Sequence, residues 1–376
     1  MRKIKENRMV VRKDIELKVS KVRKLFLDEK NYAAVYLQRR DHFSWLTSGG
    51  YNGVAYNTMK GECGILVTEN RFCLVTNTIE KRRILEEELY DLPVDIMEYS
   101  WFESLEDALR KAVPNGRIAS DHTSSCTVDE TEALNQLRYS LTSLELERYL
   151  YFGELATDIL ESFCMGIKPG QSERDIAAGL NQAYLSAGLT PTVTLVGCDD
   201  RIDIYRHPIA TAKIFTEKCM VVSCVSYKGL IVALTRMIYV KNPCEAKERF
   251  KHTARIDAEM ITATQAGAST KALFEQVKVL YAEAGYADEW RLHHQGGAIG
   301  YQNRDYLITP TSTETIQLNQ AFAWNPSIQG TKSEDTILTS ESGPEIITCS
   351  QSGWPRINVV LSSGCKLSRP DIYTLD

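Results

Sequence analysis

The chain has 376 residues, of which 43% are hydrophobic, a share typical of soluble globular proteins, and this length predicts two domains rather than one. The formal net charge of -5, from 44 basic and 49 acidic side chains, provides no basic surface for nucleic acid or an anionic membrane, so neither is expected as a partner. No segment reaches the roughly 20 apolar residues of a membrane span, and the first residues are charged where a secretion signal is apolar, so we expect a cytoplasmic protein.

The first 140 or so residues alternate helical and strand patterns. Apolar residues at helical spacing predict a helix over residues 12–29. Short apolar runs predict three strands, at residues 33–37, 64–67 and 72–75. Two further helical patterns follow, at residues 79–90 and 102–112. These elements predict a compact mixed α/β domain over residues 1–142.

A long helix is predicted to begin near Leu144 and to end before the break at Lys168-Pro169-Gly170, so the second domain is expected to cover residues 143–376. Within it, residues 169–189 and 266–286 align without gaps at an offset of 97. Each copy contains a glycine turn, a Ser cap, a helix and an Ala-Gly stop. The two copies indicate either a common cap-helix-stop unit or two duplicated α+β halves with a site between them.

Four segments of this second domain carry recognisable motifs. They are Gly197 with Arg206-His207-Pro208, residues 227–236, residues 293–300 and residues 325–336. In order and spacing they resemble the pita-bread-fold family of aminopeptidase P, prolidase and creatinase. The resemblance implies an N-terminal creatinase-like α/β domain, then a pita-bread α+β domain with pseudo-twofold halves, in a homodimer.

The resemblance also implies two bridged metal ions held by two Asp, one His and two Glu, because paired cations need several carboxylates. The positions that match these ligands are Val222, Ala233, Gly297, Asn325 and Glu334. Val and Ala offer no lone pair, and one carboxylate cannot hold two metal ions. We therefore predict no metal ligands at these positions and no cofactor.

The predicted catalytic residues are His207, His293 and Glu334. By resemblance, His207 lies beside the scissile bond, where an imidazole can move a proton without a metal, as in creatinase. His293 precedes Gly296 and Gly297, whose missing side chains are expected to leave space for a ligand. A structural role remains open for each of the three residues, and Cys198 is an alternative nucleophile beside His207.

Arginines indicate the substrate class. Arg304 occupies the position where the resemblance implies a second substrate-side His, and its planar fork binds carboxylates well. Arg206 and Arg236 stand in the neighbouring motifs, so we expect a small anionic or zwitterionic substrate; structural ion pairs are the alternative. The complete set of predicted substrate-binding residues is Arg304, Arg236, Arg206, Tyr301, Asn325 and His294.

Three functions agree with these residues. The first is a metal-independent, creatinase-like hydrolase of a small amide, amidine or related C–N bond, on an Xaa-Pro peptidase-type scaffold. The second is a non-catalytic pseudo-peptidase that binds a small anionic or zwitterionic ligand. The third is an Xaa-Pro aminopeptidase or dipeptidase with an atypical metal site.

Overall fold

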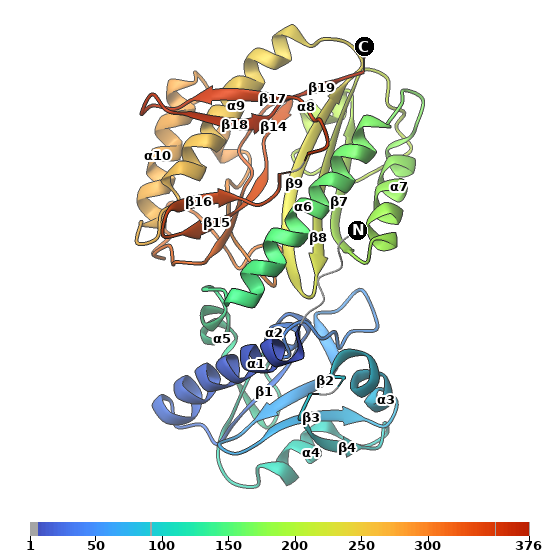
Figure 1. Ribbon diagram of the computed structural model, residues 1–376, viewed down its shortest axis with the longest axis vertical. Helices are drawn as coiled ribbons and strands as arrows, with labels where there is room; N and C mark the ends of the chain where they lie inside the picture. Colours follow the sequence, from blue (N-terminus) through green and yellow to red (C-terminus); the bar gives the residue numbers. More distant parts are fainter. Residues whose placement is uncertain (1–6, 91, 350, 376) are drawn as a thin grey trace. The chain divides into compact units, whose positions relative to one another are not determined.

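The computed structural model describes residues 7–90, 92–349 and 351–375. The chain forms two compact units (Figure 1). The first unit ends at Leu144 and includes Lys228–Leu230, and the second begins at Glu145. The boundary expected from the sequence, before residue 143, lies two residues ahead of this division.

The first unit is built on a six-stranded mixed sheet with the order β4-β3-β2-β1-β5-β6. Its strands are β1 (Ala34–Arg39), β2 (Lys60–Val67), β3 (Phe72–Asn77), β4 (Asp95–Tyr99), β5 (Ile118–Ser120) and β6 (Thr127–Asp129). Its helices are α1 (Arg8–Val22), α2 (Arg40–Leu46), α3 (Lys81–Arg83), α4 (Leu105–Ala112) and α5 (Thr131–Leu137), with π-helical turns η1 (Arg23–Glu29) and η2 (Ile84–Glu88). The helix predicted over residues 12–29 is present as α1 continued by η1, and it buries Ile15, Val19, Val22 and Phe26.

The second unit contains two larger sheets, with the orders β19-β9-β8-β7 and β11-β10-β12-β15-β16. The strands of the first are β7 (Thr190–Cys198), β8 (Lys218–Tyr227), β9 (Leu230–Tyr239) and β19 (Tyr373–Thr374). The strands of the second are β10 (Gly296–Ile299), β11 (Tyr306–Leu307), β12 (Ala321–Trp324), β15 (Asp335–Ser340) and β16 (Gly343–Ile346). Two small hairpins pair β13 (Ser327–Ile328) with β14 (Thr331–Lys332) and β17 (Arg356–Val360) with β18 (Lys366–Pro370).

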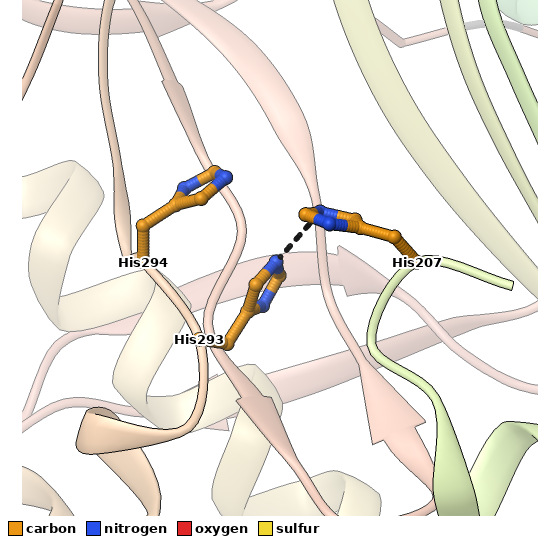
Figure 2. Close-up of side chains that lie close together, drawn as sticks. All are labelled: His207, His293 and His294. Carbon is orange, nitrogen blue, oxygen red and sulfur yellow. Dashed lines mark hydrogen bonds between the residues drawn. The ribbon is translucent and has the colours of Figure 1, made fainter.

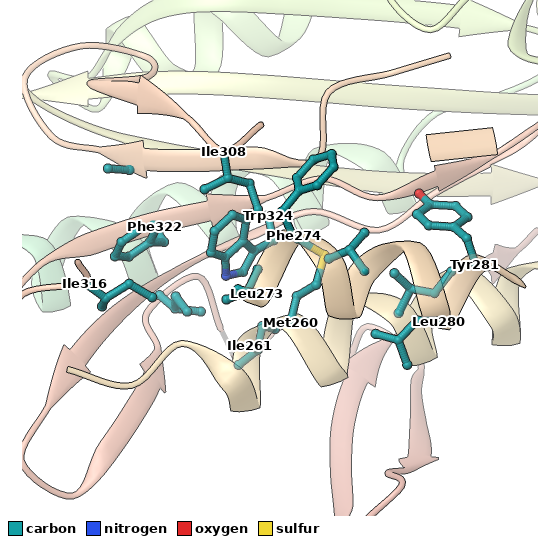
Figure 3. Packing of buried hydrophobic residues seen from close by; sticks show 14 of the residues in the cluster. Met260, Ile261, Leu273, Phe274, Leu280, Tyr281, Ile308, Ile316, Phe322 and Trp324 are labelled. Carbon is teal, nitrogen blue, oxygen red and sulfur yellow. The ribbon is translucent and has the colours of Figure 1, made fainter. Parts of the chain in front are cut away.

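The helices of the second unit are α6 (Ser143–Met165), α7 (Glu173–Ser186), α8 (Asp200–Ile204), α9 (Cys244–Ala263), α10 (Thr270–Glu283) and the 3-10 turn η3 (Glu289–Arg291). Side chains of α9 and α10 pack on the five-stranded sheet, where Met260 and Phe274 meet Phe322 and Trp324 of β12 (Figure 3). The Trp324 indole is fully buried and donates to Thr264 Oγ1 at 2.9 Å. This apolar layer fixes the end of β12, and with it the position of Asn325.

The two copies of the internal repeat have the same local structure. Helices α7 and α10 each contain 14 residues. Ser172 accepts a hydrogen bond from Asp175 N at 3.1 Å, and Ser269 accepts one from Ala272 N at 3.4 Å. Each helix is followed by a glycine of positive φ, Gly188 or Gly285. This agreement favours two duplicated halves.

No helix among the described residues is long and apolar enough to cross a membrane.

Candidate functional site

Three histidine side chains of the second unit turn toward one another (Figure 2). His207 lies in the loop after α8, and His293 and His294 lie between η3 and β10. His207 Nε2 is 3.1 Å from His293 Nε2, and the rings of His293 and His294 are 4.7 Å apart. His207 is exposed, His294 is half-buried and His293 is buried. The cluster therefore opens to solvent on the His207 side.

Hydrogen bonds allow us to assign the tautomers of two of these imidazoles. Arg304 Nη2 lies 3.3 Å from Asn325 Oδ1, and because a guanidinium only donates, this contact assigns the amide oxygen of Asn325. The amide nitrogen then lies 3.3 Å from His293 Nε2, which accepts. His293 therefore carries its proton on Nδ1 and donates to Ser327 Oγ at 3.0 Å.

The same assignment gives the state of His207. Its Nε2 faces the unprotonated Nε2 of His293, so it donates, and the lone pair of the ring is on Nδ1. Burial and the Lys332 cation lower the pKa of His207. Burial, with Arg304 next in size, lowers the pKa of His294 to about 4. Burial and Lys332 lower the pKa of His293 far below its usual range, so all three rings are neutral near pH 7.

Glu334 forms the centre of a second cluster. Its Oε2 accepts from Thr235 Oγ1 at 2.6 Å and lies 2.8 Å from Lys332 Nζ, and its Oε1 lies 3.1 Å from Arg304 Nη2. Burial acts to raise the pKa of this carboxyl, but the Lys332 and Arg304 cations outweigh it and lower the pKa to about 2. The carboxylate is therefore ionised, and both of its oxygens are occupied.

Two cations face this single carboxylate. The side chain of Arg304 is 14% exposed, and its Nε is buried without a hydrogen-bond partner among the described residues. A buried donor without an acceptor is costly, and a small anion would supply the acceptor and balance the excess positive charge. Asn325 connects this cluster to the histidines, because it accepts from Arg304 and donates to His293.

The predicted site residues do not all meet here. The clusters bring together His207, His293, His294, Arg304, Asn325 and Glu334, and Arg206 borders them by donating to Ser327 Oγ at 3.3 Å while pairing with Glu289.

Arg236 and Tyr301 form their contacts elsewhere, which corrects their expected place. Arg236 is 1% exposed and pairs with Glu161 at 2.7 Å and Asp335 at 3.2 Å. The Tyr301 hydroxyl is buried and donates to Glu145 at 2.6 Å. Cys198 is fully buried in β7, which argues against the alternative nucleophile.

Sequence reasoning missed Lys332, Thr235 and Ser327. Lys332 precedes Glu334 by two residues in an extended segment, and side chains two apart in such a segment share a face. That spacing was the available signal for the Lys332–Glu334 pair. Thr235 lies inside the motif segment 227–236, which was its available signal, and Ser327 reaches the site through tertiary packing without a local signal.

Comparison with known proteins identifies the family. The model of metallopeptidase family M24 matches residues 147–341. The chain belongs to metallopeptidase family M24. An uncharacterized peptidase of Staphylococcus aureus strain MW2 is 25% identical to this M24 chain over 296 residues, which are 76% of the chain and 78% of that relative.

Solved structures confirm the predicted mixed α/β, pita-bread fold. An Xaa-Pro dipeptidase from Bacillus anthracis has a TM-score of 0.74 and 18% identity, with 89% of this chain and 97% of that chain covered. A prolidase from Pyrococcus horikoshii OT3 has a TM-score of 0.75 and 17% identity, with 90% of this chain and 99% of that chain covered. The N-terminal domain of FACT complex subunit SPT16 from chickpea reaches 0.68 at 9% identity, with 89% and 97% covered. At these identities the likeness shows the fold, and function has to be argued from the site.

The residues at the positions that the resemblance assigns to metal ligands do not fit a pair of metal ions. Val222 and Ala233 are buried apolar residues of β8 and β9. A Cβ at Gly297 would lie 2.0 Å from the Tyr306 carbonyl oxygen, and one at Gly296 would lie 2.1 Å from that of Ala323. The expectation that these glycines open space for a ligand is therefore wrong, because backbone of the neighbouring strands fills it.

Proposed function

We propose that this M24 chain hydrolyses the C–N bond of a small substrate that carries a carboxylate, without the two-metal centre of the family. The observation that carries the proposal is the Arg304–Lys332–Glu334 cluster, with its excess positive charge and its unpartnered Arg304 Nε, joined through Asn325 to the His207–His293 pair. The cluster supplies a binding group, and the imidazole pair supplies a group that moves protons.

The charge of the cluster narrows the substrate class. Glu334 already accepts from three donors, and its single negative charge faces the two positive charges of Lys332 and Arg304. An amidine or guanidinium group would meet the positive charges of Lys332 and Arg304. We therefore favour an amide with a nearby carboxylate over the cationic substrates that creatinase-like chemistry implies.

His207 is the residue we assign to proton transfer. Its Nδ1 lone pair can take a proton from water, whose oxygen then attacks the carbonyl carbon. The resulting imidazolium can return that proton to the leaving nitrogen as the C–N bond breaks. His293 supports both steps, because its Nε2 accepts from His207 Nε2 and holds the ring in one orientation.

A matched set of substrates tests the proposal. N-acyl amino acids and dipeptides would be incubated with the protein, and each acid would be compared with the same compound carrying a C-terminal amide. The amine that is released would be measured by mass spectrometry. We expect turnover of the acids alone, and no loss of rate with EDTA. His207→Asn should lower kcat by about 100-fold to 10,000-fold with little change in KM. Arg304→Lys should instead raise KM, since lysine has no donor equivalent to the open Nε–H of Arg304.

Other outcomes separate the alternatives. Carboxylates that raise the melting temperature without being hydrolysed would indicate the non-catalytic binding protein. Hydrolysis that EDTA abolishes would indicate a peptidase with an atypical metal site. Equal rates for acids and amides, or full activity of His207→Asn, would contradict the roles proposed for Arg304 and His207.

A further inference from the structure

We infer that His207, His293 and His294 bind one zinc-type divalent ion, at a place distinct from the M24 ligand positions. One ring nitrogen from each residue lies within 4.8 Å of the other two, and the closest pair, His207 Nε2 and His293 Nε2, is 3.1 Å apart. Zinc binds imidazole nitrogen at about 2.0–2.1 Å, so two nitrogens of a tetrahedral site lie about 3.3 Å apart. His207 and His293 already have nearly this separation, and the ligand nitrogen of His294 lies within 4.8 Å of both.

The ligand set selects the kind of ion. Three imidazoles without a carboxylate or thiolate suit Zn²⁺, Cu²⁺ or Ni²⁺ and do not suit Mg²⁺, Ca²⁺ or Mn²⁺, which prefer oxygen. Four-coordinate zinc with three protein ligands keeps one position for water or an anion. Because His207 is exposed, that position faces solvent.

One hydrogen bond of the cluster matches a metal-binding imidazole. His293 donates from Nδ1 to Ser327 Oγ at 3.0 Å, which is the outer contact that orients such a ring. Its Nε2 exchanges the contacts with Asn325 and His207 for the ion when it binds. His207 must move its proton from Nε2 to Nδ1 before Nε2 can bind. Because His207 is exposed, water can exchange that proton.

Charge sets the strength of the site. Arg304 and Lys332 repel a cation at the histidines, and Glu334 offsets only one of these charges. We therefore expect reversible binding, with an anion as the fourth ligand. A bound ion also occupies His207, so zinc should inhibit the proposed hydrolysis, and this consequence alone rests on the proposed function.

Direct binding tests the site without any substrate. The full-length chain, stripped with EDTA and dialysed, would be titrated with zinc chloride by calorimetry, and the bound metal measured by elemental analysis. Cobalt absorption in the visible range would report a tetrahedral nitrogen environment. We expect one zinc per chain, and no saturable binding of manganese or magnesium.

Three single variants locate the ion. His207→Ala and His294→Ala should each weaken zinc binding at least 10-fold, with circular dichroism verifying that both remain folded. His252→Ala is the matched control, because His252 is an exposed histidine of α9 and should bind as the parent does. Absence of saturable zinc binding, or equal affinity in the parent and in His207→Ala, would overturn the inference and, in the second case, direct attention to the exposed Cys244, Cys349 and Cys365.

The two proposals fail separately. If the protein hydrolyses the substrates but does not bind zinc, only the inferred metal site is wrong. If it binds zinc but does not hydrolyse them, only the proposed reaction is wrong. If both hold, zinc should lower the rate in the parent, and EDTA should restore it.

Discussion

The resemblance assigns Glu334 to the last metal-ligand position of M24, yet its contacts favour another role. In a two-metal centre a carboxylate balances cations from outside the chain. Here Lys332 and Arg304 provide that positive charge from within the chain, at 2.8 and 3.1 Å. The carboxylate therefore holds two basic side chains in position, and the proposed binding of an anion is assigned to them.

Glu334→Gln tests this role through stability. The substitution keeps the shape of the side chain but leaves two largely buried cations without a counter-charge, and breaking a buried ion pair typically costs about 3–5 kcal/mol. We expect the free energy of unfolding in urea to fall by about that amount at pH 7. Glu98→Gln is the control, because the Lys81–Glu98 pair is exposed on both sides and should cost less than about 1 kcal/mol.

The pH dependence of the same pair of proteins gives a second readout. The pKa of Glu334 is about 2 in the folded chain, below its ordinary value of 4.5, so its contribution is present above pH 4.5 and is lost as the pH falls toward 2. The difference between the parent and Glu334→Gln should therefore narrow over this range. A variant as stable as Glu98→Gln at pH 7 would show that the buried pair contributes nothing.

At the scale of elements, strand alternation explains why one motif arginine was misplaced. Thr235 and Arg236 are neighbours in β9, so their side chains point to opposite faces of the sheet. Thr235 donates to Glu334, whereas Arg236 reaches Glu161 on the other side. Two residues that are adjacent in a strand motif therefore need not belong to the same site.

Regular elements were easier to predict than contacts between them. Apolar spacing located α1, α4 and the three strands β1, β2 and β3 of the first unit, because burial of one face leaves its period in the sequence. The strands β4, β5 and β6 were not predicted. The same period did not distinguish the α-helical from the π-helical part of residues 8–29. For the site, the family motifs located His207, His293 and Arg304, while Tyr301 bonds to Glu145 across 156 positions, a pairing that no local pattern encodes.

Strand β10 offers a prediction at this scale. Gly297 lies between β11 and β12, opposite Leu307 and Ala323, and a Cβ there would approach the Tyr306 carbonyl oxygen to 2.0 Å. Backbone cannot yield as a flexible side chain does, so Gly297→Ala should lower the free energy of unfolding by about 1–3 kcal/mol or more.

Gly166→Ala is the matched control for this change, because its nearest atom would be the Phe163 carbonyl oxygen at 3.4 Å. It should stay within about 0.5 kcal/mol of the parent. Thermal unfolding followed by circular dichroism measures both. If Gly297→Ala were as stable as Gly166→Ala, β11 would have room to move, and this strand position could also hold the metal-binding His of the family.

At the scale of the whole molecule, the five positions that the resemblance assigns to metal ligands are distributed over several elements. The five ligand positions lie in β8, β9 and β10, directly after β12 and directly before β15, so they belong to both large sheets. The residues at these positions make contacts that a metal ligand would have to replace. Val222 packs with Leu195, Met220 and Met237 in an apolar cluster, and Asn325 bonds to both Arg304 and His293.

Restoring carboxylates alone should therefore not restore the metal centre. The variant Val222→Asp/Ala233→Asp/Asn325→Glu supplies three acids, but two of them replace buried apolar side chains, and Gly297 still lacks the imidazole that β11 excludes. The new carboxylates should pair with Lys332 and Arg304, which lie beside Glu334, rather than with metal ions. We expect a lower melting temperature, because buried acids are costly.

Elemental analysis after dialysis against manganese should find no stoichiometric ion in either this variant or the parent, since manganese prefers oxygen ligands and does not suit the three histidines. Two manganese ions per chain in the triple variant, with a melting temperature that rises with manganese, would show that the missing side chains were the only obstacle and that the strands themselves still form the M24 centre.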